Sequence, residues 1–317
     1  MNTSTKERQM CSQTTRSLGE DPVGSVPSWE RCLGTELPGP WEADVTRSRH
    51  FPAVLNDALV GVEKNGPATR LQCILPDSEY SIPSFTRILL FSRQNRLFSE
   101  HERLEYLVPD EEAGKFAAEL LRSPTPPIEY RVQDEGVRDV LVCTHGSRDA
   151  CCATYGFPLY KALRERAEEL GIRVWRTSHT GGHRFAPTLI DMPGGHYWAH
   201  LDINSLESVL GRKDDVATLR QHYRGWAGVS GAPAQAAERE VFLREGWKWL
   251  DYLKSAATTE ADGRYEVSIE YASPDGSESG RYEVLVEQAG VVPLPNCMSE
   301  GAKGDVPQYR VAELRRV

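Results

Sequence analysis

The sequence lacks the features that would place the protein in a membrane or send it across one. Within its 317 residues, no window approaches the roughly 20 consecutive apolar residues of a membrane-spanning helix. The opening segment, MNTSTKERQMCSQTTRS, is polar and lacks the apolar centre of a secretory signal. The seven cysteines are an odd number spread unevenly over a large chain, which is not a disulfide framework. We therefore expect no membrane partner and a reducing, cytoplasmic location.

The chain also lacks an excess of positive charge. It contains 37 Lys and Arg residues against 46 Asp and Glu residues, which gives a formal net charge of −9, and it has no arginine-rich arm. This acidic balance argues against nucleic acid as a partner. The sequence has no Rossmann-type glycine fingerprint either, so it predicts no bound nicotinamide or flavin.

What remains is the composition of an ordinary globular protein, with 26% charged and 39% apolar residues. The length predicts two domains or one long elaborated domain. We divide the chain into a flexible N-terminal segment over residues 1–25, an α/β domain over 26–127 and a second domain over 128–317. The hinge is PTPP (124–127), because these prolines cannot continue the helix predicted before them.

Strand and helix patterns alternate in both halves, which predicts an α/β fold. Apolar runs predict strands at 29–37, 69–76, 86–93, 138–143, 172–178, 186–192, 196–201, 264–272 and 281–288. Helical spacing of apolar residues predicts helices at 52–66, 110–123, 158–171 and 234–255. The second half has the order of a thioredoxin-like domain: strand, helix, strand, strand pair, helix. A C-terminal helix and β-hairpin follow it. The first half has a similar order, which is compatible with an internal duplication.

One stretch concentrates metal-ligand chemistry. CTHGSRDACC (143–152) follows a predicted strand, and HTGGH (179–183) follows the next one. Functional groups of α/β sheets lie at such strand ends. Thiolate sulfur and imidazole nitrogen bind zinc, copper and iron–sulfur iron. Two adjacent glycines argue against a helix between the histidines and allow the backbone to approach a bulky inorganic group.

The residues alone leave several readings open. Zinc is one, although eight residues between Cys143 and Cys152 exceed the two to four of structural zinc sites. Thiol–disulfide chemistry and a cysteine nucleophile are others. His145 is a candidate spare ligand or hydrogen-bond donor. Arg184 is a candidate electrostatic partner of the metal centre or of a surface carboxylate. Four other cysteines have no ligand-spaced neighbour and are expected to be ordinary buried residues: Cys11, Cys32, Cys73 and Cys297.

Two long motifs carry a resemblance to a known family. VCTHGSRDACCATYGFPLYKAL and VWRTSHTGGHRFAPTLI closely resemble the sucrase/ferredoxin-like family, whose metal domain is similar to thioredoxin-like [2Fe–2S] ferredoxins. The match is dense over about 138–201. It is looser in the first half, where Cys11-Ser12 and PGPW (38–41) fit the family's opening. No paired-carboxylate signature supports a hydrolase.

The resemblance implies a bis-cysteinyl, bis-histidinyl [2Fe–2S] cluster held by Cys143, Cys152, His179 and His183, with Cys151 as an alternative to Cys152. It implies an electron carrier of intermediate, pH-dependent potential, more than a stand-alone enzyme. A separate reductase and a separate electron acceptor are the implied partners. The alternatives are a zinc-stabilised adaptor domain on a thioredoxin scaffold and a thiol–disulfide oxidoreductase using Cys143, Cys151 or Cys152.

Overall fold

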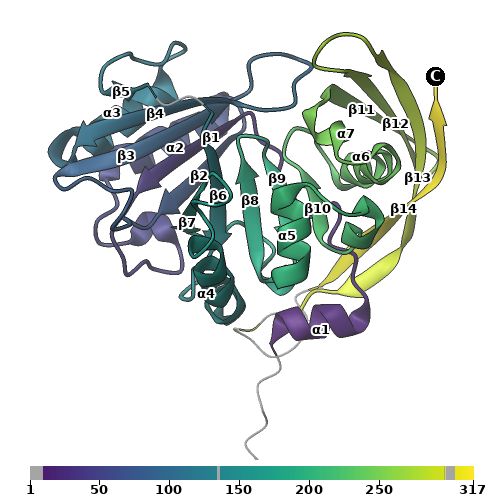
Figure 1. Ribbon diagram of the computed structural model, residues 1–317, viewed down its shortest axis with the longest axis horizontal. Helices are drawn as coiled ribbons and strands as arrows, with labels where there is room; N and C mark the ends of the chain where they lie inside the picture. The colour runs from purple at the N-terminus through teal and green to yellow at the C-terminus, as the bar shows by residue number, and fades with distance from the viewer. Residues whose placement is uncertain (1–9, 134–135, 296, 298–303) are drawn as a thin grey trace, which may run out of the picture.

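The computed structural model describes residues 10–133, 136–295, 297 and 304–317. Two sheets and the helices around them form a mixed α/β structure (Figure 1). Within these described residues, the larger sheet has ten strands: β1 Arg31–Glu36, β2 Thr69–Ile74, β3 Phe85–Ser92, β4 Glu102–Pro109, β5 Arg131–Val132, β6 Arg138–Cys143, β7 Ile172–Thr177, β8 Thr188–Met192, β9 His196–Ala199 and β10 Tyr223–Trp226. The smaller, antiparallel sheet has four: β11 Leu253–Ala261, β12 Arg264–Ala272, β13 Ser279–Pro293 and β14 Asp305–Arg316.

The helices connect these strands or cover them. They are α1 Cys11–Leu18, α2 Ala53–Asn65, α3 Asp110–Arg122, α4 Ala150–Arg164, α5 Ile203–Gly211, α6 Ala232–Glu245 and α7 Lys248–Asp251, with 3-10 turns η1 Val45–Arg47, η2 His183–Phe185 and η3 Val216–Leu219. In the described part of the chain, no helix combines the length and the apolar character that crossing a bilayer requires.

The large sheet consists of two units with the same topology. In the first unit the elements β1–α2–β2–β3–β4–α3 give the strand order β2-β1-β3-β4, and in the second β6–α4–β7–β8–β9–α5 give β7-β6-β8-β9. In each unit the first two strands are parallel and the following strands are antiparallel. The units join edge to edge where Ile74 of β2 pairs antiparallel with Thr177 of β7. The duplication expected from element order is therefore present as shared topology.

Both faces of the large sheet are buried. In β3, Ile88 and Leu90 pack with α2 and α3, whereas Leu89 and Phe91 point to the opposite face. On that opposite face they share a core with residues of the second unit, among them Leu141. Strands covered on both faces read as continuous apolar runs, which is why these segments are recognisable in the sequence.

A buried ion network links the two units across the sheet. Arg103 of β4 contacts Asp139 of β6 at 2.8 Å, and Arg173 of β7 contacts Glu105 of β4 at 2.8 Å and Asp139 at 3.0 Å. Four strands separate β4 from β6 in the sheet order. The sheet must therefore curve strongly to bring these side chains together.

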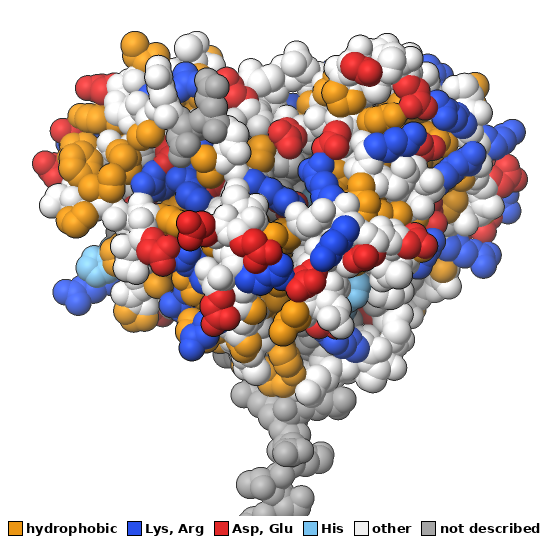
Figure 2. All heavy atoms as spheres, in the orientation of Figure 1, with side chains coloured by type: hydrophobic (Ala, Val, Ile, Leu, Met, Phe, Trp, Pro, Cys, Tyr) orange, Lys and Arg blue, Asp and Glu red, His pale blue; other side chains and the backbone are white. Residues whose placement is uncertain are grey.

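On the face that Figure 2 shows, the exposed acidic and basic side chains are interspersed.

Two predicted helices have different boundaries in the structure. The helix predicted at 158–171 begins at Ala150, because Asp149 caps it, and Pro158 lies inside it. Pro158 has no N–H to donate to the carbonyl of Thr154. Because Thr154 is exposed, water can hydrogen-bond to this carbonyl instead. The helix predicted at 234–255 ends at Glu245, because Gly246 adopts φ 75°. Its last predicted residues form α7 and the first part of β11.

The N-terminal segment is also more ordered than the sequence suggested. Residues 1–9 of the expected flexible segment lie outside the described residues. Residues 11–18 form α1, which packs against η2, and Ser12 donates a hydrogen bond to the carbonyl of Ala186 at 2.5 Å.

The C-terminal strands form a four-stranded sheet that wraps α6 and α7 (Figure 1). The predicted hairpin is the central pair of this sheet, β12 and β13.

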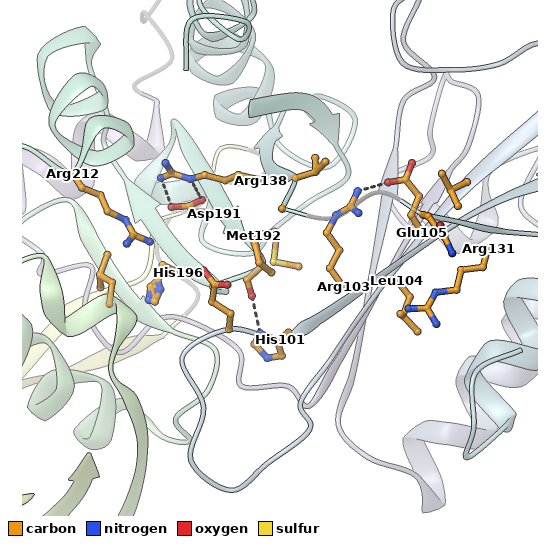
Figure 3. A pocket seen from close by; sticks show the side chains of 18 of the residues that line it. His101, Arg103, Leu104, Glu105, Arg131, Arg138, Asp191, Met192, His196 and Arg212 are labelled. Carbon is orange, nitrogen blue, oxygen red and sulfur yellow. Dashed lines mark hydrogen bonds and ion pairs between the residues drawn. The ribbon is translucent and has the colours of Figure 1, made fainter. Parts of the chain in front are cut away.

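His101 is a buried histidine at a cleft between the two units. It lies in the β3–β4 loop, 2% exposed, with its ring 4.3 Å from Trp29 and 5.0 Å from Phe98. Its Nδ1 is 3.0 Å from the carbonyl oxygen of Pro193 (Figure 3). The cleft has a volume of about 800 Å³. Burial lowers the pKa of His101 from 6.5 to about 4.

This pKa predicts acid sensitivity. Between pH 6.5 and 4 the imidazole of the unfolded chain binds a proton while the folded one stays neutral, so stability is lost as pH falls. The shift corresponds to about 3 kcal/mol of unfolding free energy by pH 4. Denaturant titration at pH 7 and pH 4 should show this loss in the wild type, reduced in His101→Gln. The exposed His50→Gln should behave like wild type, and equal losses in all three proteins would contradict the assignment.

Candidate metal centre

The predicted site lies at the end of the large sheet where β6 and β7 finish side by side. Cys143 is the last residue of β6, and the next residue, Thr144, donates its backbone N–H to the carbonyl of Thr177 at the end of β7 at 3.2 Å. The loop over residues 144–149 then returns the chain to the start of α4. Two parallel strands therefore deliver the first thiol and the histidine segment to one edge of the sheet.

The second thiol is presented by the first turn of α4. The Asp149 carboxylate caps this helix by accepting the backbone N–H of Cys151 at 2.9 Å. Cys151 and Cys152 are adjacent in this turn and point to different neighbours. Cys152 lies with Cys143, whereas Cys151 lies with another pair of cysteines. The N-terminal end of a helix favours negative charge, so both positions suit thiolates.

His179 meets the two thiols of Cys143 and Cys152. Its Nδ1 is 3.5 Å from Sγ of Cys152 and 3.9 Å from Sγ of Cys143. The ligand atoms of these three residues all lie within 4.8 Å of one another, and both cysteines are buried. The structure thus brings together three of the four residues that the sequence analysis selected.

His183 lies beside this group but makes other contacts. Its ring centroid is 5.9 Å from that of His179. Its Nδ1 is 3.1 Å from Oδ2 of Asp149 and 3.2 Å from Sγ of Cys11. An N–H at Nδ1 can donate to the carboxylate, which leaves Nε2 as the second ring nitrogen. The fourth predicted ligand is therefore adjacent to the other three, with one nitrogen engaged by Asp149.

The thiols of Cys143 and Cys152 differ in pKa. A hydrogen bond from the Cys152 thiol holds the pKa of Cys143 well below its usual value, and the same interaction raises the pKa of Cys152. In the absence of metal, one sulfur of the pair therefore ionises first and the other retains its proton. A buried thiolate beside an imidazole is a nucleophilic group that a metal ion would bind with release of the second proton.

Gly181 and Gly182 shape the loop between the histidines. Both have positive φ, 86° and 65°, which favours glycine. The fully buried Arg224 of β10 lies beneath them, and its guanidinium donates to the carbonyl of Gly181 at 3.1 Å. A Cβ on Gly182 would come within 2.5 Å of the same guanidinium. The glycines therefore allow a close approach of the backbone to a buried arginine.

His145 orients the backbone of His179. Its Nδ1 accepts the N–H of His179 at 3.2 Å, and its Nε2 lies 2.8 Å from the carbonyl of Glu42. Its ring packs edge-on against Trp41 of the PGPW motif. Both ring nitrogens are thus occupied by the backbone, so the reading of His145 as a spare ligand is wrong. His145 acts instead as a hydrogen-bonding residue, which was the other role expected for it.

Arg184 pairs with a carboxylate on the N-terminal segment. Its Nε lies 2.8 Å from Oε1 of Glu20, which is 2% exposed, and its guanidinium stacks over Phe185. The partner carboxylate is therefore buried and not on the surface. This contact fixes η2, which begins at His183, against the segment that follows α1.

The sequence analysis missed a second group of sulfurs. Cys11, from the start of α1, and Cys297, which follows β13, lie beside Cys151. The expectation that Cys11 and Cys297 are isolated buried cysteines is wrong, because these two residues are in contact in the folded chain. They are 286 residues apart in the sequence, so no local pattern could show this contact. The only signal was the fit of Cys11-Ser12 to the family's opening motif. No signal pointed to Cys297.

These elements define an α/β protein with a cysteine- and histidine-lined centre at the ends of two parallel strands. Residues 22–225 match the Sucrase/ferredoxin-like family, and the chain belongs to that family. The matched range includes the whole large sheet apart from the final residue of β10.

A curated relative gives a more distant comparison. The chain is 30% identical over 143 residues to "Altered inheritance of mitochondria protein 32" from Meyerozyma guilliermondii. The aligned region covers 40% of this chain and 49% of that protein, so the chain spans about half the length of this relative. The comparison with solved structures gives no significant match.

Proposed function

We propose that this protein transfers electrons through one [2Fe–2S] cluster held by Cys143, Cys152, His179 and His183. The observation that carries the proposal is the convergence of two thiols and one imidazole at the ends of β6 and β7, with the second imidazole adjacent. The order β6–α4–β7–β8–β9–α5 around them is compatible with a thioredoxin-like fold, and the family name includes ferredoxin-like proteins; both support the proposal.

The donor set is chemically suited to such a cluster. Two thiolates and two sulfides balance the charge of two ferric ions, so the oxidised centre would be neutral, whereas four thiolates would leave a double negative charge. For this reason histidine-ligated [2Fe–2S] centres have potentials of roughly −150 to +300 mV, against about −400 mV for plant-type ferredoxins. When bound, the cluster would supply one-electron transfer at an intermediate potential, coupled to protons through the imidazole N–H groups.

The surrounding residues would hold the donors in place. Asp149 accepts from Nδ1 of His183, which leaves Nε2 to bind iron and makes the ring a better donor. His145 fixes the backbone of His179, and Arg224 fixes the carbonyl of Gly181. The thiols are carried by a strand end and a helix end, both of which are buried in the core. Rigid ligands reduce the reorganisation that accompanies a change of redox state.

A second candidate, a zinc-stabilised adaptor domain, is favoured by one distance. The 3.5 Å between Sγ of Cys152 and Nδ1 of His179 is close to the separation of about 3.6 Å for two donors on one tetrahedral zinc. A two-iron unit would require the thiols and the imidazoles to move apart. The long loop between Cys143 and Cys152 favours the larger unit, and metal analysis separates the two candidates.

The test is the metal content of anaerobically purified protein. We expect red-brown protein with about two iron and two acid-labile sulfides per chain, and a pH-dependent potential in redox titration from pH 6 to 10. Cys143→Ser should lose the colour, whereas Cys32→Ser, a change at a buried cysteine of β1, should keep it. Colourless protein with zinc on these ligands would establish the second candidate. Metal-free activity that depends on free thiols would indicate the oxidoreductase.

The partners in this proposal are a separate reductase and a separate acceptor. The sequence has no nicotinamide or flavin fingerprint, so electrons would arrive through protein contact. His179 lines a shallow surface cavity of about 660 Å³ together with Asp44, Thr46 and Arg148. A partner seated there would contact the edge of a ligand. We place this exchange in the cytoplasm, where thiols stay reduced, and cell fractionation tests that location.

A further inference from the structure

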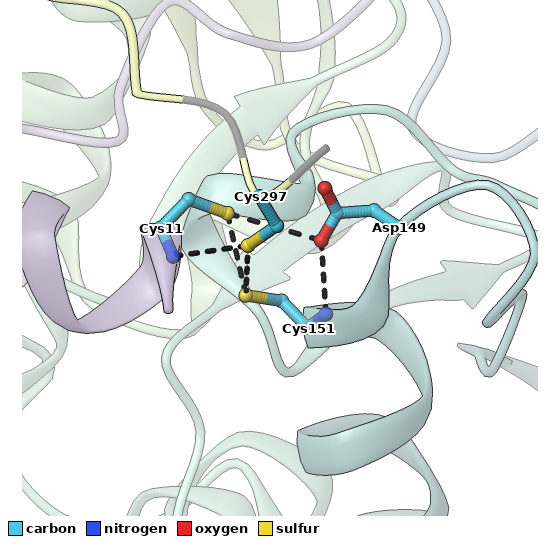
Figure 4. Close-up of side chains that lie close together, drawn as sticks. All are labelled: Cys11, Asp149, Cys151 and Cys297. Carbon is cyan, nitrogen blue, oxygen red and sulfur yellow. Dashed lines mark hydrogen bonds between the residues drawn. The ribbon is translucent and has the colours of Figure 1, made fainter. Parts of the chain in front are cut away.

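A second group of possible metal ligands lies beside the proposed cluster site. Sγ of Cys151 is 3.3 Å from Sγ of Cys11 and 3.2 Å from Sγ of Cys297 (Figure 4). Asp149 completes the group, with Oδ1 3.8 Å from Sγ of Cys11. The four ligand atoms all lie within 4.8 Å of one another. This set shares no residue with the four proposed cluster ligands.

The group is buried and assembled from three distant parts of the chain. Cys11 begins α1, Cys151 and the capping Asp149 belong to the start of α4, and Cys297 follows β13. All four residues are at most 4% exposed. A buried thiol packs equally well among other apolar side chains, so burial alone does not bring three thiols together. Their convergence from three segments favours a shared metal ion.

The carboxylate is the second observation that points to a cation. Asp149 is 1% exposed, and the polar groups around it are the backbone N–H of Cys151, the thiol of Cys11 and the imidazole of His183. A buried carboxylate and three thiols that can lose protons are stabilised when a metal ion compensates their charge. Thiolate ligands select soft or borderline metals, which excludes magnesium and calcium.

We propose that Cys11, Cys151, Cys297 and Asp149 bind one structural Zn²⁺ with three sulfur ligands and one oxygen ligand. Four protein donors and full burial match the closed coordination of structural zinc, which has no open position for water. Two thiolates on a tetrahedral zinc are about 3.8 Å apart, so the sulfurs need to separate by only about half an ångström. Zinc binding would release the thiol protons and form zinc–sulfur bonds without any change of oxidation state.

Such a site would hold two distant parts of the chain, α1 and Cys297, against the start of α4. Bound zinc would join α1 and the segment after β13 to the first turn of α4, the turn that also carries Cys152. Asp149 would contact zinc through one oxygen while its other oxygen accepts from His183. The proposed zinc therefore lies next to the proposed cluster and supports its ligands, but it does not depend on the cluster being present.

X-ray absorption at the zinc edge tests the site in the purified wild-type protein. We expect one zinc per chain with three sulfur neighbours at about 2.3 Å and one oxygen neighbour at about 2.0–2.2 Å. Two sulfurs and two nitrogens would instead place zinc on Cys143, Cys152, His179 and His183, and would overturn the inference. Absence of zinc, iron at this site, or a disulfide between two of the three cysteines would overturn it as well.

Matched variants separate this inference from the proposed function. Cys297→Ser should lose the zinc, whereas Cys32→Ser should retain it. The double variant Cys143→Ser/His179→Ala should lose iron and sulfide and still hold one zinc. If the wild type contains zinc with three sulfurs but no iron, the proposed function fails and the zinc site stands. If Cys297→Ser retains full zinc, the zinc site fails and the cluster proposal is unaffected.

Discussion

Gly156→Ala is expected to destabilise the protein by about 3 kcal/mol and to abolish metal binding at Cys143 and Cys152. Gly156 lies in α4, and a Cβ at this position would be 2.0 Å from the carbonyl oxygen of Cys143. The obstacle is backbone, so no side-chain rotation relieves it. The helix must move away from β6, and this movement separates the two thiols that α4 and β6 bring together.

The matched control is Gly61→Ala in α2. At Gly61 a Cβ would meet no described atom within 4 Å, so the substitution brings only the higher helix propensity of alanine. That variant should be about 0.5–1 kcal/mol more stable than wild type and keep its metal. Denaturant unfolding and metal analysis of the two variants measure both effects. Wild-type stability and metal content in Gly156→Ala would show that α4 does not need this close approach.

Much of the fold can be predicted from the sequence, because strands buried on both faces are continuous apolar runs. The strands containing Leu33, Leu89 and Leu141 are recognisable in this way. β4 was not assigned, because its sequence, ERLEYLVP, places charged residues in the strand that join the network with Asp139. Such a pattern is typical of an exposed segment. In the structure the charged side chains of β4 that join the network are buried, because the curvature of the sheet brings their partners to them.

The C-terminal region shows a different limit. Leu243, Trp247 and Leu250 are spaced by four and then three residues, which predicted one helix across them, but the positive φ of Gly246 breaks it. The four-stranded sheet depends on long-range pairing, which local patterns do not encode. β11 and β14 pair along the two outer edges of the recognisable β12–β13 hairpin.

For the candidate site, motif spacing predicted which segments meet but not how their side chains are divided. Cys151 and Cys152 are adjacent in sequence and differ in partner because successive residues of a helix point about 100° apart. The roles of Asp149 and His145 depend on capping and on backbone contacts across the loop. Sequence patterns identify chemical types, whereas these roles are set by tertiary packing.

Arg224 is a positioning residue that sequence patterns also missed, and its replacement should have the second large effect. Its guanidinium donates to the carbonyls of Gly181 at 3.1 Å and Ser25 at 2.8 Å, and to the Ser25 hydroxyl at 3.0 Å. One side chain therefore fixes the loop between His179 and His183 to the N-terminal segment. Burial lowers the pKa of Arg224 to about 10, so it stays charged near neutral pH.

Arg224→Met should cost about 2–5 kcal/mol of unfolding free energy, because the carbonyls of Gly181 and Ser25, which lie against this fully buried side chain, lose their donor. Arg220→Met is the control: Arg220 is 45% exposed and pairs with Glu240, so its loss should cost at most about 1 kcal/mol. Arg224→Lys restores the charge but not the forked geometry and should recover only part of the stability.

A spectroscopic readout separates positioning from a purely structural role. If Arg224 holds the histidine loop in place, the reduced centre of folded Arg224→Met protein should give an altered electron paramagnetic resonance spectrum and a shifted potential. Arg220→Met should give the wild-type spectrum. An Arg224→Met protein that is less stable but spectroscopically identical to wild type would show that the loop keeps its geometry without the arginine, because the two positive-φ glycines and the Asp149 contact to His183 suffice to hold it.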